Sequence, residues 1–170
     1  MSVSKRLIEA HCNIDLQTEN GQTSIHVAVT EGHASVTEQL IEAHCDVDLQ
    51  ENDGGTALHD DTMEGYTSVT KKLIEAHCNM DLPNKDGTTS LFVVAKNGNA
   101  SVTEQMIEAR CDIELPAENG KTPLFITVTE GHVDVTDQVI EAHCNMDLED
   151  KDGSTSLLIA AATGYASVTK

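Results

Sequence analysis

The sequence predicts an all-α solenoid of stacked helix-turn-helix units that are joined by β-hairpin-like turns. The main observation is a strict period, because the five cysteines lie at positions 12, 45, 78, 111 and 144, each 33 residues after the last. Two glycine series keep the same step, one from Gly21 to Gly153 and the other from Gly32 to Gly164. Self-similarity at a fixed period of this size is typical of a repeat array.

The composition indicates one domain with a core of small side chains. The chain has 170 residues, of which 39% are apolar but only 2% aromatic, so Leu, Ile, Val, Ala, Met and Cys must supply the core. We therefore expect a single domain over residues 1–170. It comprises a partial repeat with only a second helix at 1–16, full repeats at 17–49, 50–82, 83–115 and 116–148, and a partial repeat at 149–170.

The repeat at residues 50–82 shows how one unit is expected to fold. It opens with a turn rich in Asp and Gly, after which the Thr56 hydroxyl is expected to cap a first helix that ends at Gly65. A second helix is predicted over 67–77, since its apolar residues form one stripe. Residues 78–82 are expected to run extended into the next turn. One unit has too little apolar area to fold alone, so neighbouring units must stack.

These units resemble the ankyrin repeat over essentially the whole chain. The family signature T-P-L-H-x-A corresponds here to TSIHVA (23–28), TALHDD (56–61), TSLFVV (89–94), TPLFIT (122–127) and TSLLIA (155–160). The Gly-His pair of the family is kept at Gly32-His33 and Gly131-His132. The resemblance implies a non-catalytic scaffold that binds partner proteins through its turn tips and the concave face of its first helices.

Two departures from the family pattern recur in every unit. His or Arg replaces the family's Gly after the second helix, at His11, His44, His77, Arg110 and His143. We expect these residues to tolerate the left-handed conformation of a helix C-cap, where a cation also suits the helix dipole. Cys replaces the family's Ala and is expected to act as a small buried apolar residue.

The repeated His-Cys pairs also allow a metal- or redox-responsive array as an alternative function. Neighbouring units are expected about 8–10 Å apart, which is too far for a disulfide or for a shared zinc ion. One His-Cys pair supplies only two ligands, so we expect no metal site and no cofactor.

Asp60 and Asp61 stand where the other units carry mostly apolar pairs such as Val27-Ala28. The first residue of each pair is predicted to be a core position, and His59 is the expected partner of the carboxylates. Two interpretations are open. One is a local acidic or metal-binding pocket. The other, which we favour because no Cys/His cluster completes a site, is a degenerate repeat that frays.

The formal charge of −19 indicates which partners suit the chain. An acidic surface repels phosphate backbones and anionic lipid, so we expect a protein partner, with a basic surface, and neither nucleic acid nor membrane. No catalytic constellation is present, and no enzymatic activity is expected. The candidate contact residues lie in the variable turn tips: Glu19, Asn20, Gln22, Glu51, Asn52, Lys85, Glu118, Lys121 and Lys151.

The two ends of the sequence and the odd number of cysteines bear on the cellular location and on whether the array is longer than this chain. Five cysteines and an N-terminus without a signal-peptide pattern predict an intracellular, cytoplasmic location. Apolar residues of the core series stand in both terminal units, so the chain is expected either to be a fragment of a longer array or to associate end to end. A recruitment segment of a larger enzyme, such as a kinase or ubiquitin ligase, is a further alternative.

Overall fold

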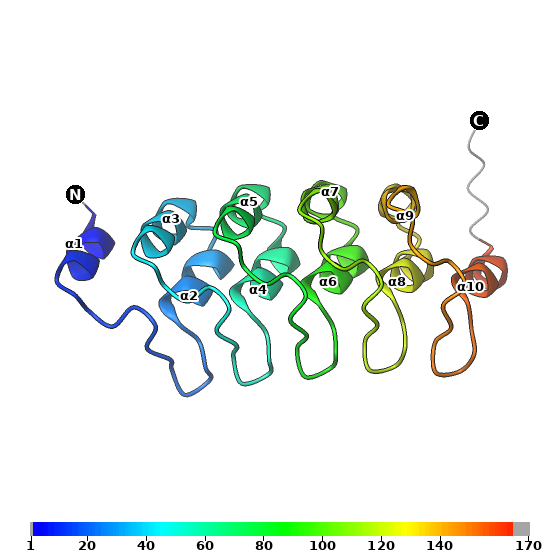
Figure 1. Ribbon diagram of the computed structural model, residues 1–170, viewed down its shortest axis with the longest axis horizontal. Coiled ribbons are helices and arrows are strands. Elements are labelled where there is room, and N and C mark those ends of the chain that lie inside the picture. The colour runs from blue at the N-terminus through cyan, green and yellow to red at the C-terminus, as the bar shows by residue number, and fades with distance from the viewer. Residues whose placement is uncertain (1, 165–170) are drawn as a thin grey trace.

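The computed structural model describes residues 2–164, and within that range the chain forms ten helices (Figure 1). The helices are α1 (Val3–Glu9), α2 (Ser24–Thr30), α3 (Ala34–Glu42), α4 (Ala57–Glu64), α5 (Thr67–Glu75), α6 (Ser90–Asn97), α7 (Ala100–Glu108), α8 (Pro123–Glu130), α9 (Val133–Glu141) and α10 (Ser156–Thr163).

The helices lie in two rows, and each helix contacts the next member of its own row. The first row holds α2, α4, α6, α8 and α10, and the second row holds α1, α3, α5, α7 and α9. The turns project below the first row in the view of Figure 1. Within residues 2–164, strand-like pairing is limited to one isolated bridge between Glu149 and Thr155. The predicted all-α solenoid is therefore confirmed.

The first-row helices begin at the predicted threonines. The Thr89 hydroxyl accepts a hydrogen bond from the backbone N–H of Phe92, as expected of an N-cap. Thr56 forms a capping box with His59, in which its hydroxyl accepts from the backbone N–H of His59, as predicted, and its own backbone N–H donates to Nδ1 of His59 at 3.2 Å. Helix α4 ends as predicted at Gly65, which has a φ of 76°. Helix α5 ends two residues before the predicted position 77.

Small aliphatic side chains fill the space between the rows, as the composition predicted. Val69 and Leu73 of α5, and Met106 of α7, are fully buried. Phe92 and Phe125 are also buried, so the core takes both phenylalanines in addition to the residue types expected. Because each layer is one repeat thick, every core residue packs against its own repeat and its neighbours.

Backbone hydrogen bonds connect each turn tip to the next. The amide of Lys85 donates to the carbonyl of Asp53 at 2.8 Å, and the amide of Glu118 donates to that of Asp86 at 3.0 Å. Gly87 is required at this contact, since it has a φ of +72° and a Cβ there would lie 2.7 Å from the Glu118 nitrogen. The periodic glycines of the turns therefore allow adjacent tips to approach closely.

The connectors form a second ladder, although their predicted extended conformation is wrong. Met80 and Asp81 form a turn, in which the Asp81 amide donates to the side-chain oxygen of Asn79 at 3.1 Å. Short polar side chains favour such local bonds over a strand. The Asn79 amide in turn donates to the carboxylate of Asp48 in the preceding connector at 2.8 Å.

The residue after each second helix adopts the left-handed conformation, as predicted. The φ values of His11, His44, His77, Arg110 and His143 lie between 57° and 65°. All five side chains are exposed. The chain therefore accepts a strained backbone at a position where glycine would cost less.

Replacing His44 by Gly is expected to stabilise the protein by about 1 kcal/mol, because glycine adopts positive φ without a Cβ clash. Urea unfolding followed by circular dichroism measures the change. Ala43→Gly is the matched control, since Ala43 has a φ of −84°, and it should destabilise the protein by about 0.5–1 kcal/mol. A loss of stability in His44→Gly would show that the imidazole contributes a contact that offsets the backbone strain.

Candidate protein-binding surface

The predicted contact residues follow the row of turn tips, but only part of the set faces solvent fully. The exposed members are Glu19, Asn20, Asn52, Lys85, Glu118 and Lys151. Gln22, Glu51 and Lys121 are half-buried. The Lys121 ammonium lies 5.0 Å from the centre of the Phe125 ring, and the Asn52 amide group donates to the carbonyl of Glu19 at 2.7 Å. Contact with a partner stays a prediction for each of the nine.

The first-row helices add a stripe of side chains beside the turns, with an i, i+3 spacing and an exposure that differs between repeats. We call it the first-helix stripe, and it comprises Val27 and Thr30, Asp60 and Met63, Val93 and Lys96, and Ile126 and Thr129. Val27 is 50% exposed and Met63 is 66% exposed, whereas Ile126 is buried. The stripe varies from apolar to acidic to basic along the array, as expected of a surface that determines specificity rather than packing.

The structure corrects the prediction that Asp60 occupies a core position. Asp60 is half-buried on the first-helix stripe, whereas Asp61 is 0% exposed and faces α5. The positions equivalent to Asp61 in other repeats are Ala28, Val94 and Thr127, and all three are buried. The second residue of the pair is therefore buried in each of these repeats, whereas the first varies from the exposed Val27 to the buried Ile126. Helix α4 is continuous over Ala57–Glu64, and fraying of this repeat stays a prediction.

The Asp61 carboxylate accepts a hydrogen bond from Thr70 and not from His59, which was the predicted partner. The Thr70 hydroxyl donates to its Oδ2, while its Oδ1 has no hydrogen-bond partner. Burial raises the pKa of Asp61 to about 7, and the Thr70 hydrogen bond opposes that shift only in part. His59 instead bonds Thr56 and places Nε2 3.0 Å from the Thr88 carbonyl. Burial lowers the pKa of His59.

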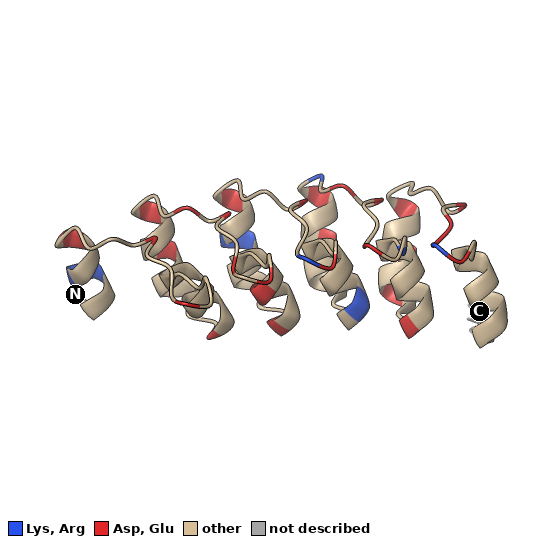
Figure 2. Cartoon of the chain, turned by 90° about the horizontal axis from the view of Figure 1, so that it is seen from below, with Lys and Arg blue, Asp and Glu red and all other residues tan. Residues whose placement is uncertain are grey.

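The acidic charge is concentrated in the N-terminal part of the array. Between Arg6 and Lys71 the sequence has no Lys or Arg, and we call residues 7–70 the acidic half. Its thirteen acidic residues are Glu9, Asp15, Glu19, Glu31, Glu38, Glu42, Asp46, Asp48, Glu51, Asp53, Asp60, Asp61 and Glu64. In Figure 2, red segments occur on helices and turns along this part, and blue segments enter the turns only further along the array. Electrostatic attraction for a cationic partner is therefore strongest here.

The periodic cysteines are structural, with one exception. Cys45, Cys78, Cys111 and Cys144 are buried free thiols, whereas Cys12 is exposed. Burial, together with nearby carboxylates, raises the pKa of Cys45, Cys78 and Cys111 to about 12. A thiolate is the reactive form of cysteine, so these thiols are poor nucleophiles and poor metal ligands. Their environment favours a packing role over the redox-responsive alternative.

Comparison with known protein families agrees with this architecture. The family model described as ankyrin repeats (3 copies) matches residues 2–82, 61–150 and 91–170. No curated protein matches the sequence. Among the described residues, no helix has both the length and the apolar character needed to cross a membrane.

Replacing Asp61 by Val should stabilise the protein by roughly 1–3 kcal/mol, because it removes a buried carboxylate oxygen without a partner. Val94 occupies the equivalent position in the next repeat and is fully buried, so the shape fits. Thermal unfolding followed by circular dichroism measures the effect. Asp61→Asn is the matched control, since it keeps the shape and the acceptor for Thr70. A lower Tm for Asp61→Val would show that the Thr70 bond outweighs desolvation.

Thiol titration of the native protein should distinguish the exposed Cys12 from the four buried cysteines. At pH 8 we expect a colorimetric disulfide reagent to label Cys12 rapidly, and the four buried cysteines only after denaturation, since burial disfavours their thiolates. A Cys12→Ser variant should then show no rapid labelling. Rapid reaction of more than one thiol in the folded wild-type chain would contradict the packing role and favour the redox-responsive alternative.

Proposed function

The chain belongs to the ankyrin-repeat family, and from that premise we propose that it is a scaffold whose acidic half binds a basic segment of a partner protein. Ankyrin repeats are generally protein-protein interaction modules and typically have no catalytic activity. The observation that carries the finer proposal is the absence of any Lys or Arg between Arg6 and Lys71, on repeats whose turn tips and first-helix stripe face solvent.

Charge complementarity is the physical basis of this proposal. A partner with Lys or Arg side chains gains long-range attraction on approach, and like-charged competitors are repelled. The exposed apolar residues Val27 and Met63 lie on the stripe among these carboxylates. A basic segment with apolar side chains at intervals would use both features, because apolar burial supplies affinity while charge supplies rate and specificity.

An intracellular location fits the same proposal. All five cysteines are free thiols in the fold, and secreted proteins of this cysteine content usually form disulfides.

A peptide-display library screened against the full chain at low salt tests the proposal. We expect the selected peptides to be enriched in Lys and Arg and to lose affinity as salt rises. Reversing Glu19 and Glu31 together to Lys should weaken binding of a selected peptide at least about tenfold, which corresponds to 1.4 kcal/mol.

The double variant Glu130→Lys with Asp137→Lys is the matched control. Both residues are exposed and lie outside residues 7–70, Glu130 occupies the position equivalent to Glu31 three repeats later, and the change in net charge is identical. The control should alter the affinity less than about threefold, since its carboxylates lie outside the proposed surface. Equal loss in both variants, or selected peptides without basic residues, would refute binding by the acidic half.

A further inference from the structure

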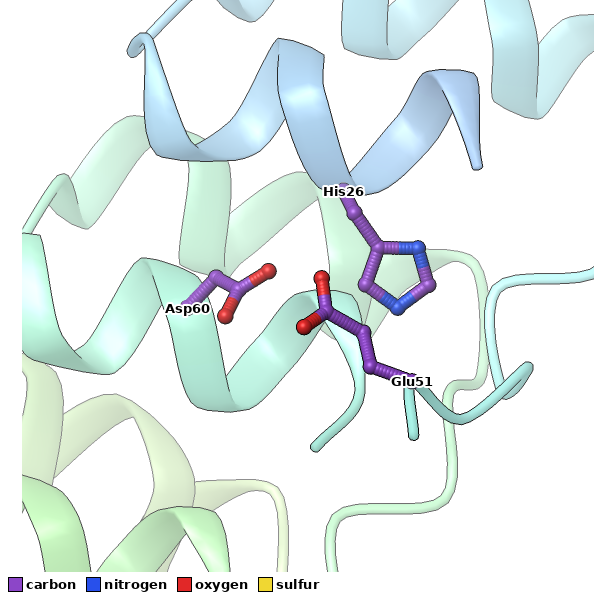
Figure 3. A group of neighbouring side chains, drawn as sticks. All are labelled: His26, Glu51 and Asp60. Atoms are coloured by element: carbon purple, nitrogen blue, oxygen red, sulfur yellow. The ribbon is translucent and has the colours of Figure 1, made fainter. Parts of the chain in front are cut away.

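Three side chains from two neighbouring repeats converge at the contact between α2 and α4 (Figure 3). His26 comes from α2, Glu51 from the turn before α4, and Asp60 from α4. One ring nitrogen of His26 and one carboxylate oxygen from each acid lie within 4.8 Å of one another. Figure 3 shows the two carboxylate groups facing each other beside the imidazole.

Each of the three side chains has a buried polar atom without a hydrogen-bond partner. These atoms are Nε2 of His26, Oε1 of Glu51 and Oδ2 of Asp60. His26 is 0% exposed, so water does not satisfy its free nitrogen from outside. Carbonyl groups of Leu49 and Gly55 lie near the ring and raise its pKa against burial, but neither accepts a bond of normal geometry from Nε2. Unsatisfied buried groups are rare and require an explanation.

No Lys or Arg within residues 2–164 forms an ion pair with the two acids. Among the described residues, the ion pairs are Lys71 with Glu75 and Lys72 with Glu38, and neither involves this cluster. Burial, together with the charges of Glu51, Asp53 and Asp61, raises the pKa of Asp60 to about 7. The arrangement is thus an anionic pair beside an imidazole, and a cation between them would relieve the repulsion.

The three residue types meet at only one of the four equivalent contacts between full or partial repeats in the described chain. At the contact between α4 and α6 the corresponding residues are His59, Asn84 and Val93. At the contact between α6 and α8 they are Phe92, Ala117 and Ile126, and at that between α8 and α10 they are Phe125, Asp150 and Ile159. The cluster is therefore not a by-product of the repeat pattern.

We propose that His26, Glu51 and Asp60 bind a first-row divalent transition ion such as Zn²⁺ between the first two full repeats. One imidazole nitrogen and two carboxylate oxygens form a donor set that suits such ions, whereas Ca²⁺ and Mg²⁺ prefer oxygen alone. With bond lengths of about 2.0–2.2 Å, ligand atoms of one zinc ion lie about 3.4 Å apart. Side-chain rotation of Glu51 and Asp60, which are half-buried, closes the remaining distance, and water fills the fourth position.

The second nitrogen of His26 has polar partners, and metal binding requires it to change from acceptor to donor. Its Nδ1 lies 2.8 Å from the Thr23 hydroxyl and accepts the Thr23 amide proton at 3.2 Å. In the metal-free chain the ring proton is therefore on Nε2. On binding, the ion takes the Nε2 lone pair and the proton resides on Nδ1, where it is donated to the Thr23 hydroxyl. The Thr23 amide bond is lost in exchange, and a polar partner on the second nitrogen is typical of metal-bound histidine.

Isothermal titration of the full metal-free chain with Zn²⁺ tests the proposal. We expect one ion to bind with an affinity that Asp60→Val and His26→Phe each reduce at least about tenfold. Val and Phe occupy these positions in the repeat at 83–115, so both variants keep side chains that the fold accepts. Circular dichroism verifies that each variant is folded, and bound Zn²⁺ should raise the Tm of the wild type but not of Asp60→Val.

His59→Phe is the matched control. His59 has the same capping bond as His26, but Asn84 and Val93 stand at the positions equivalent to Glu51 and Asp60. It should bind Zn²⁺ as the wild type does. Co²⁺ used as a spectroscopic probe should give ligand-field bands without a thiolate charge-transfer band. A thiolate band would assign the ion to a cysteine such as Cys12, and equal Zn²⁺ affinity in Asp60→Val and the wild type would place it away from this cluster. Either result would overturn the proposal. This test does not depend on the identity of any protein partner.

Discussion

The fold depends on contact between neighbouring repeats, because no repeat buries its apolar face alone. Three sets of interactions hold neighbouring repeats together in this chain. They are side-chain packing between the helix rows, backbone hydrogen bonds between turn tips, and hydrogen bonds from connector amides to side chains of the preceding connector. Each set repeats with the period of the sequence, as the Lys85 and Asn79 amides illustrate. A residue within these sets can vary only if both neighbouring repeats accept it, so most variation is confined to the turn tips and the first-helix stripe.

Asp60 and Asp61 show how this constraint separates two adjacent carboxylates. Asp61 faces the interior of its own repeat, where the Thr70 hydroxyl donates to one carboxylate oxygen and the other has no partner among the described residues, so burying this carboxylate lowers the stability of the fold. Asp60 faces the preceding repeat across the stripe, near Glu51 and His26, and its surroundings can be completed from solvent. An aspartate therefore lowers stability at position 61 and supplies a candidate metal ligand at position 60. The difference arises because successive residues of a helix point about 100° apart.

The sequence was sufficient for the period, the helix caps and the left-handed histidines, since each follows from a local rule applied five times. It was insufficient to decide between Asp60 and Asp61 for the core, because Val27 and Ala28 are both apolar and the rotation of a two-turn helix depends on its neighbours. The cluster was missed because His26 matches the capping pattern and its carboxylates belong to the next repeat. A comparison of each histidine with the acidic residues of the next repeat would have identified it.

A cation at this cluster would act on one contact of the array and not on the whole. In a linear array, stability is approximately the sum of the repeats and their nearest-neighbour contacts, so an ion held by His26 on one side and by Glu51 and Asp60 on the other strengthens that contact alone. This contact lies within the acidic half, where mutual repulsion among carboxylates opposes close stacking. The ion would also occupy the first-helix stripe and neutralise part of its charge. Metal binding and attraction for a basic partner would therefore oppose one another at the same carboxylates, because both depend on the same negative charge.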